Sequence, residues 1–356
     1  MGLIPQRDYF DKDIANSDNT SGYYIIEHND FVYNPRKSSD APYGPISRYA
    51  YPDAGIVSPL YLCFRAKGDV DTNFFEWYFR SSAWHRYIYM TGDSGARHDR
   101  VSIKDDDFFS MPIRFPSSIE QKKIASFLNA IERRISSQQL LVNNLKKYKR
   151  GVMQHIFRRT TTQSVKAWTC VRLGDIFKKV SRRNIDGLVK NVITNSAEYG
   201  LIPQRDFFDK DIAVDGNTAN YYVIEKGDFV YNPRKSNTAP YGPFNRYTLD
   251  EKGIISPLYT CLVLKADIYP SYLAWYFKSD AWHRYIYDNG SQGVRHDRVS
   301  MTDDLLMGIP VIFPDQAKQQ EYADILDKIE ARLQAAQKVY DLLIKEKCGY
   351  MQQLFI

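Results

Sequence analysis

The chain has 356 residues, of which 44% are hydrophobic, so it is neither a disordered protein nor too short to bury a core. A formal net charge of +6 is too small to indicate nucleic-acid binding on its own, and four cysteines outside Cys-x-x-Cys spacing favour neither a zinc ribbon nor a disulfide framework. Because no apolar run approaches the roughly 18 residues of a membrane helix and the first residues do not resemble a signal peptide, we expect a cytoplasmic protein with no membrane partner.

An internal repeat organises the whole chain. GLIPQRDYFDKDIA, which begins at Gly2, returns as GLIPQRDFFDKDIA at Gly200. FVYNPRKS, APYGP, AWHRYIY and RHDRVS return with the same separation of 198 positions, so residues 2–158 align with residues 200–356 without a gap. A period this long indicates duplication of a whole domain with its appendage, not a solenoid.

Each copy begins with a globule of mixed secondary structure. Short alternating segments such as YYIIE, FVYN and GIVSPLYLCF, separated by Gly, Pro, Asn and Asp, predict strands. Residues 73–89 predict one helix, whose aromatic residues have the spacing of a helix packed on a sheet. We therefore predict the α/β (α+β) class, with core positions for these aromatic side chains.

A long helix follows each globule. Ser118 can cap a helix that runs to about Phe157, with apolar positions alternately four and three residues apart, as in a coiled-coil seam. We expect the two seams to bury against each other, with Gln138 and the Lys149/Lys347 pair helping to set register and orientation. The predicted packing residues are Ile124, Leu128, Ile131, Ile135, Val142 and Leu145 in the first helix and Leu326, Ile329, Leu333, Tyr340 and Leu343 in the second.

The predicted organisation has five segments. They are a first globule over residues 1–116, a central long helix over 117–158, a linker over 159–167, a second globule over 168–314 and a C-terminal long helix over 315–356.

Residues 168–199 precede the second copy and have no counterpart before the first. This stretch holds a strand-like WTCVRL, a turn at Gly174 and the apolar LVKNVIT. We expect the first globule to be N-terminally truncated, with an unpaired sheet edge or an open core. Three explanations are open. They are a gene start placed too late or a cloned fragment, a natural truncation by recombination, and completion by a partner chain.

Two polar clusters recur in both copies. The first cluster lies on loops stiffened by Pro and Gly, and its Arg, Lys and Asn side chains could bond base edges while spare cations hold phosphate. We interpret it as a DNA-recognition surface, the alternative being loops that only solvate strand ends. Its residues are Asn34, Arg36, Lys37, Tyr43 and Arg48, with Asn232, Arg234, Lys235, Tyr241 and Arg246.

The second cluster follows a glycine-bearing loop. Two arginines that flank a His-Asp pair could bind phosphate, or an Arg–Asp pair could instead pin the loop. Its residues are Arg97, His98 and Arg100 in the first copy and Arg295, His296 and Arg298 in the second.

Catalytic signatures are absent from the sequence. It has no GxxxxGK[ST], GxSxG or HExxH motif, and NPRK lacks the Pro-Pro-aromatic run of an amino-methyltransferase. The acidic residues 105–107 lack the lysine partner of a nuclease centre and fit the start of a helix better. We predict a protein that is not an enzyme and has no metal site.

The order of these parts resembles the specificity subunit of type I restriction-modification systems. FVYNPRKS, APYGP and the long helices that start after MPIRFP and IPVIFP carry the resemblance. It implies two target recognition domains separated by two long helices in an antiparallel coiled coil, and a subunit that binds double-stranded DNA without catalysis. It also implies methylation subunits and, through them, restriction subunits as partners. S-adenosylmethionine, ATP and Mg²⁺ would belong to those partners, which leaves this chain without a cofactor.

The repeat adds an expectation about the DNA target. Antiparallel helices would relate two nearly identical globules by an approximate dyad, so we predict a bipartite, near-palindromic target with half-sites about one helical turn or slightly more apart. Only the Ser-Asp after the first NPRKS and the Asn-Thr after the second would shift a base preference. The alternative function is a scaffold, or a silent specificity-subunit fragment, that acts as an interaction protein without recognising DNA.

Overall fold

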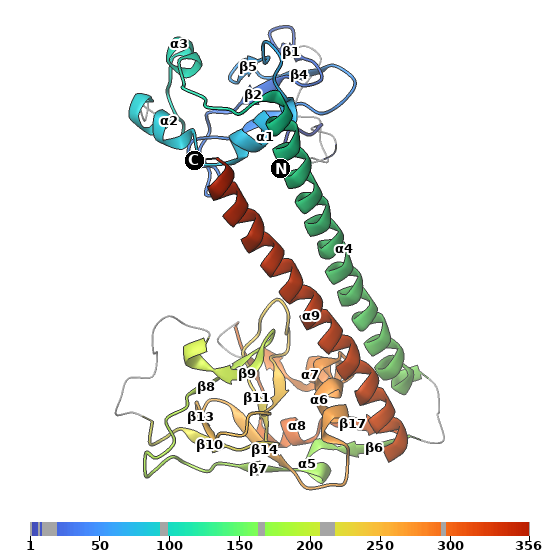
Figure 1. Ribbon diagram of the computed structural model, residues 1–356. Coiled ribbons are helices and arrows are strands. Elements are labelled where there is room, and N and C mark those ends of the chain that lie inside the picture. The colour runs from blue at the N-terminus through green and yellow to red at the C-terminus, as the bar shows by residue number, and fades with distance from the viewer. Residues whose placement is uncertain are drawn as a thin grey trace. The chain divides into compact units, whose positions relative to one another are not determined.

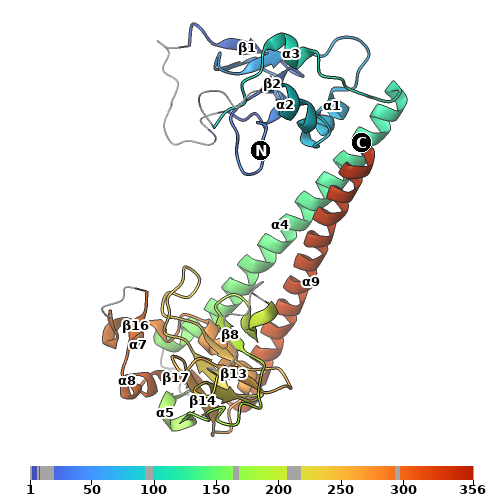
Figure 2. The same cartoon turned by 90° about the vertical axis from the view of Figure 1, so that its left-hand side faces the viewer.

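The computed structural model describes residues 2–5, 8, 20–92, 99–162, 168–206, 218–292 and 297–355 (Figure 1). The chain divides into two compact units, unit 1 of residues 1–141 with 336–356 and unit 2 of residues 142–335. Each unit holds one globule and segments of both long helices, which lie side by side within it (Figures 1 and 2). The unit boundaries therefore fall inside the long helices, and the five segment boundaries above stay predictions.

The globule of unit 1 is built on strands of three residues. A three-stranded antiparallel sheet has the order β3-β2-β5, and β1 pairs separately with β4. The central strand is buried throughout, so the sheet has its core on both sides of β2. The strands are β1 (Tyr24–Ile26), β2 (Phe31–Tyr33), β3 (Ile46–Arg48), β4 (Gly55–Val57) and β5 (Leu62–Phe64).

The single helix predicted over residues 73–89 is two helices, α1 (Thr72–Arg80) and α2 (His85–Thr91). Ser81 ends α1, because its hydroxyl donates to the Tyr78 carbonyl at 2.6 Å instead of leaving the turn free to continue. The predicted aromatic core is confirmed for Phe74, Phe75, Trp77, Tyr78, Phe79 and Trp84, which are all buried, whereas Tyr87 is half-buried and Tyr89 is exposed. The helix α3 (Asp105–Phe109) carries its three acids in the first turn, as predicted.

The globule of unit 2 repeats this sheet and adds to it. Its main sheet has the order β12-β11-β14-β7, with β10 paired to β13 as β1 is to β4. Further pairs join β17 to β6, β8 to β9 and β15 to β16. The strands are β6 (Thr169–Arg172), β7 (Phe177–Val180), β8 (Ile193–Ser196), β9 (Gly200–Pro203), β10 (Tyr222–Ile224), β11 (Phe229–Tyr231), β12 (Phe244–Arg246), β13 (Gly253–Ile255), β14 (Thr260–Leu264), β15 (Ser291–Gln292), β16 (Val299–Ser300) and β17 (Pro310–Phe313).

The helices of this globule are short. The predicted turn at Gly174 is instead part of α5, where a Cβ would lie 3.2 Å from the Met307 Cβ, so glycine lets α5 approach α8 closely. The helices are α5 (Leu173–Ile176), the 3-10 helix η3 (Gln204–Asp206), α6 (Pro270–Lys278), α7 (His283–Asn289) and α8 (Asp303–Met307).

Residues 168–199 cover an edge that unit 1 leaves open. In unit 2, β14 pairs with β11 on one side and with β7 on the other. The equivalent strand of unit 1, β5, pairs only with β2 among the described residues. The predicted unpaired edge is therefore present in the described part of unit 1.

The long helices are α4 (Ser118–Thr162) and α9 (Gln316–Leu354). Ser117 precedes α4, and its hydroxyl and backbone N–H both donate to the Glu120 carboxylate, so the cap lies one residue before the predicted Ser118. All eleven predicted packing residues are buried or half-buried.

The helix pair makes the same contacts twice. In unit 1 Lys347 Nζ lies 2.9 Å from Glu132 Oε2, and in unit 2 Lys149 Nζ lies 2.8 Å from Glu330 Oε2. The repeat maps one pair onto the other with the helices exchanged. Gln138 Nε2 donates to the carbonyl 198 residues later, that of Ala336, which occupies the same position in the second copy. The predicted antiparallel coiled coil and the predicted fold class are confirmed.

Phe157, near the C-terminal end of α4, and Phe355, directly after α9, enter the cores of the globules in unit 2 and unit 1, respectively. The Phe355 ring lies 5.5 Å from that of Phe74. Its repeat equivalent, Phe157, lies 5.7 Å from Tyr272. Each core therefore includes an aromatic side chain from the helix of the other repeat copy.

Candidate nucleic-acid interface

Arg36 of the first polar cluster lies beside Arg100 of the second in unit 1, although more than sixty residues separate these two arginines in the sequence. Arg36 and Arg100 form an antiparallel β-bridge, and the Lys37 backbone N–H donates to the Asp99 carbonyl at 2.8 Å. The Arg36 guanidinium lies 3.8 Å from the Asp99 carboxylate. We call residues 33–45 polar loop 1.

Unit 2 repeats this arrangement in polar loop 2, residues 231–243. Arg234 and Arg298 form the equivalent bridge, and the Lys235 N–H donates to the Asp297 carbonyl at 2.8 Å. The Arg234 guanidinium lies 3.6 Å from the Asp297 carboxylate. Asp99 and Asp297 were not among the predicted site residues, because their partners lie far away in the sequence.

The bridged arginines are accessible. The side chains of Arg36 and Arg234 are each 68% exposed. An exposed ion pair of this length contributes at most about 1 kcal/mol, so either guanidinium can exchange its carboxylate for another acceptor at small cost. These Arg–Asp pairs join the two clusters and are weak contacts, whereas the loop pin raised from the sequence paired residues within the second cluster.

Glycine presets the path of both loops. Gly44 and Gly242 have φ values of +81° and +84°. A Cβ at these positions would lie 2.1 Å and 2.0 Å from the carbonyl oxygens of Asn34 and Asn232. Only glycine combines that backbone conformation with so close an approach, so each loop has one fixed shape.

The two asparagines hold the arginines in place. Asn34 Oδ1 accepts the backbone N–H of Arg36 at 3.0 Å, and Asn232 Oδ1 accepts that of Arg234 at 2.9 Å. Asn232 is only 6% exposed. The geometry gives these side chains a local turn-stabilising contact, whereas the sequence suggested contact with base edges.

The predicted tyrosines pack against histidines. The rings of Tyr43 and His85 lie 5.0 Å apart, and those of Tyr241 and His283 lie 4.9 Å apart. Burial lowers the pKa of both imidazoles, which favours their neutral form. The histidines are half-buried and therefore support the tyrosine rings.

Arg48 and Arg246 lie away from the bridges. Strand register pairs Arg48 with Phe31, at the end of β2 opposite to polar loop 1. The Arg48 guanidinium donates to Glu76 at 2.8 Å and also to two asparagine side chains, so its contacts lie between β3 and α1. Burial lowers the pKa of Arg246, whose guanidinium donates to Ser271 Oγ at 3.4 Å.

The second cluster is described in part. Arg97, His98, Arg295 and His296 lie outside the described residues. Arg100 and Arg298 are half-buried, and the Nε of each is buried without a hydrogen-bond partner in the described part of the chain. A buried N–H without an acceptor costs about 1–3 kcal/mol, which an added acceptor would recover.

The described ranges contain no group of three His, Cys, Asp or Glu side chains placed to hold a metal ion. Within the same ranges, no helix is long and apolar enough to cross a membrane.

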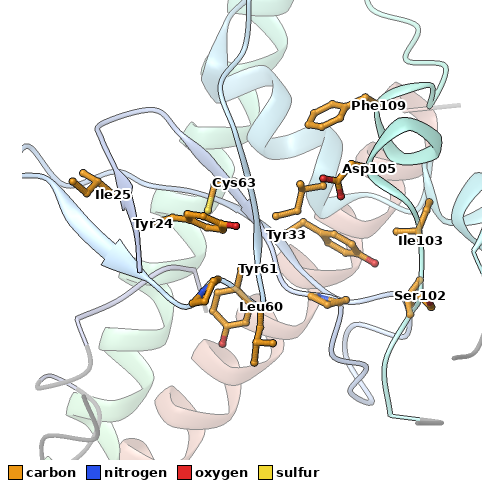
Figure 3. A pocket seen from close by; sticks show the side chains of 14 residues that line it. Tyr24, Ile25, Tyr33, Leu60, Tyr61, Cys63, Ser102, Ile103, Asp105 and Phe109 are labelled. Atoms are coloured by element: carbon orange, nitrogen blue, oxygen red, sulfur yellow. The ribbon is translucent and has the colours of Figure 1, made fainter. Parts of the chain in front are cut away.

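Unit 1 also has a cavity beside β5. This cavity of about 710 Å³ is lined mainly by aromatic and aliphatic side chains, among them Tyr24, Ile25, Tyr33 and Phe109 (Figure 3). In unit 2, β7 pairs with the equivalent strand β14. The cavity thus lies along the sheet edge that residues 168–199 cover in unit 2.

Searches with protein-family models and among curated proteins give no match. Solved structures are similar over nearly the whole chain. One is a chain from work on complex assembly and conformational transition of the type I R-M system, with a TM-score of 0.56 and 17% identity over 94% of this chain and 84% of that one. Another is the type I restriction-modification S subunit from M. genitalium, with a TM-score of 0.52 and 14% identity over 97% and 87%.

The HsdS subunit from Thermoanaerobacter tengcongensis is similar with a TM-score of 0.49 and 16% identity over 93% of this chain and 81% of that one. The first two likenesses show that this chain has the fold of type I specificity subunits.

Proposed function

We propose that this chain is the DNA-recognition subunit of a type I restriction-modification system and has no catalytic activity of its own. The observation that carries the proposal is the recurrence, in both units, of an exposed arginine on a rigid loop bridged to a second basic segment. Rigid loops that present arginine and lysine suit both base edges and phosphates.

The proposed DNA contacts are made by the same side chains in each unit. Arg36 and Lys37 act in unit 1, and Arg234 and Lys235 in unit 2. Arg97, His98, Arg100 and their equivalents Arg295, His296 and Arg298 are proposed phosphate contacts. Asn34, Asn232, Tyr43 and Tyr241 position the loops, and Arg48 and Arg246 are left out because their side chains contact the region between sheet and helix.

The proposed target is bipartite and near-palindromic. Support comes from the shared NPRKS string and from the matching bridges and ion pairs of the two units. The half-sites would lie about one helical turn or slightly more apart.

The proposed partners supply the chemistry. Methylation subunits would dock on this chain and bring S-adenosylmethionine, and restriction subunits joined through them would bring ATP and Mg²⁺. The chain itself would bind no cofactor and act in the cytoplasm. Support comes from the fold shared with specificity subunits and from the absence of catalytic motifs in the sequence.

The test is binding of a randomised duplex library by the full chain together with its methylation subunit. The double variant Arg36→Ala with Arg234→Ala should lose specific binding by about 1–3 kcal/mol for each base contact and lose much less non-specific binding. Arg284→Ala removes a more exposed arginine, also paired with an aspartate, and serves as the matched control.

An equal fall in specific and non-specific binding, with a smaller salt slope, would make the arginines phosphate contacts only. Wild-type chain that enriches no sequence while still binding the methylation subunit would favour the scaffold alternative.

A further inference from the structure

A polar cavity of about 300 Å³ lies beside polar loop 2 in unit 2. One wall comes from the loop itself, with the side chains of Arg234 and Lys235. The other wall comes from the turn that joins β8 to β9, with Asn195, Ser196 and Glu198. This turn belongs to residues 168–199, which the repeat does not place in the first copy.

Buried amides fix the start of the turn. Asn195 is 5% exposed, and its Nδ2 donates to the Val230 carbonyl at 3.0 Å. Its Oδ1 accepts from Asn245 Nδ2 at 2.7 Å, and Asn245 also donates to the Ser196 carbonyl at 3.0 Å. The turn is therefore anchored to β11 and β12, the two strands that flank polar loop 2.

The end of the turn presents a carboxylate. Ser196 Oγ accepts the backbone N–H groups of Glu198 and Tyr199, each at 3.2 Å, which closes the turn. Glu198 is exposed, and its carboxylate has no ion-pair partner in the part of the chain that the structure describes. An exposed acidic side chain thus lines the same cavity as two cations, Arg234 and Lys235, and it is the single acidic residue of that lining among the described residues.

A carboxylate at this position would oppose contact with DNA phosphates but could accept hydrogen bonds from a base. It repels phosphates, so it weakens general attraction to the duplex. It accepts hydrogen bonds from the exposed amino group of cytosine, which phosphate-binding lysines and arginines cannot do. We propose that Glu198 determines a base preference, for cytosine, in the half-site bound by unit 2, with Asn195 as the residue that positions the turn.

This proposal rests on the proposed function and refines it. In unit 1 the residue equivalent to Asn245 is Ser47, whose side chain has no amide to bond such a turn. The near-palindromic target should therefore depart from symmetry at the position that Glu198 contacts.

The experiment uses the full chain with its methylation subunit and a duplex library randomised across both half-sites and the spacer. Glu198→Gln keeps the size of the side chain and removes its charge. Glu321→Gln removes an exposed carboxylate on α9, far along the sequence from the loops, and is the matched control. Sequencing of the bound fraction and non-specific affinity at two salt concentrations are the measurements.

Glu198→Gln should reduce the preference for one C·G pair in one half-site by about tenfold, leave the other half-site unchanged and raise non-specific affinity. Glu321→Gln should leave every base preference unchanged. Base preferences in Glu198→Gln identical to those of the wild type, or lost equally in both half-sites, would overturn the proposal. A wild-type chain that enriches no sequence would instead overturn the proposed function itself.

Discussion

The two sheets make equivalent aromatic contacts with residues from different parts of the sequence. In unit 2, Phe177 on β7 lies with its ring 5.0 Å from Phe229 and 6.2 Å from Phe277. In unit 1, Phe64 on β5 lies 5.5 Å from Phe31. It also lies 5.9 Å from Phe79, and these two partners are the repeat equivalents of Phe229 and Phe277. Since the residue equivalent to Phe64 is Leu262, β5 carries the ring that β7 supplies in unit 2.

An acidic pair also receives hydrogen bonds from an arginine that comes from a different part of the sequence in each unit. Glu225 and Asp228 accept hydrogen bonds from Arg182, which follows β7. Their equivalents in unit 1, Glu27 and Asp30, accept from Arg65. Val263 stands at the position of Arg65 in the second copy. Unit 1 thus makes with β5 and the residue that follows it two contacts that unit 2 makes with a separate segment.

The contacts of Phe64 and Arg65 replace only part of what residues 168–199 provide in unit 2, because unit 1 keeps apolar side chains exposed. Ile56 on β4 is 52% exposed, whereas its equivalent Ile254 is 0% exposed and donates its N–H to the Asn191 carbonyl at 2.8 Å. Ile25 on β1 is 72% exposed and lines the cavity of about 710 Å³ beside β5. We therefore expect unit 1 to unfold more readily than unit 2, and equivalent substitutions in the two units test this comparison.

The largest effect is expected for Phe177→Ala. Phe177 is 1% exposed, and removal of a buried phenylalanine ring should lower the free energy of unfolding of unit 2 by about 3–5 kcal/mol. Phe64→Leu restores the residue of the second copy and should cost unit 1 less, because Phe64 is half-buried. Urea titration with hydrogen-exchange labelling of peptides from each unit is the measurement. Equal losses in the two variants would contradict the smaller loss expected for Phe64→Leu, and no loss in unit 1 would break the proposed equivalence of roles.

A smaller loss is expected for Arg65→Val, which also restores the residue of the second copy. It leaves the Asp30 carboxylate, 10% exposed, without its guanidinium partner, so unit 1 should lose stability at pH 7, although Asp30 keeps the hydrogen bond from the Glu27 N–H. Arg182→Val should act in the same way on unit 2 and leave unit 1 unchanged. A loss in unit 2 caused by Arg65→Val would contradict the separate pairing.

The pH dependence should differ between the two aspartates. Burial raises the pKa of Asp30, but hydrogen bonds from Arg65 and the Glu27 N–H and the Arg65 charge outweigh burial and lower it. Its contribution is present above the ordinary range of aspartate and is lost as the pH falls through the lowered pKa. The difference in Tm between wild type and Arg65→Val should therefore shrink from pH 7 to pH 3.

Asp228 should behave in the opposite way. Burial raises its pKa more than the Glu225 N–H and Arg182 lower it. Ionised Asp228 therefore costs stability at neutral pH, and unit 2 should recover that part as the pH falls through the raised pKa. The measurement is the free energy of unfolding of each unit at pH 7 and pH 3, in the wild type and in Asp228→Asn. The substitution should reduce the gain in stability of unit 2 at the lower pH.

The smallest effect is expected at the cross-helix ion pairs. Double-mutant cycles on Lys149 with Glu330 and on Lys347 with Glu132 should each give a coupling of about 0.2–1 kcal/mol, because both pairs are half-exposed. Similar couplings would support the repeat symmetry of the helix contacts. Lys347→Ala alone should cost slightly more than Lys149→Ala, since Lys347 Nζ also lies 5.7 Å from the centre of the Trp77 ring.

The sequence alone predicted the architecture because its signals are local or repeated. The separation of 198 residues established two copies, and the spacing of four and three residues predicted helices whose apolar positions are buried. Arg36 and Arg234 could be selected because their loops combine cations with Pro and Gly. These patterns are visible in the sequence because they depend on local spacing and composition or on direct repetition of the same residues.

Only the tertiary structure decided which distant residues meet. The bridge between Arg36 and Arg100 depends on backbone pairing across two segments that no periodicity connects. Likewise, strand register placed Arg48 beside Glu76, and buried amides placed Glu198 at the rim of a cavity next to Arg234. Sequence determines the local elements here through spacing and composition, whereas strand pairing and burial determine which polar side chains remain available to bind.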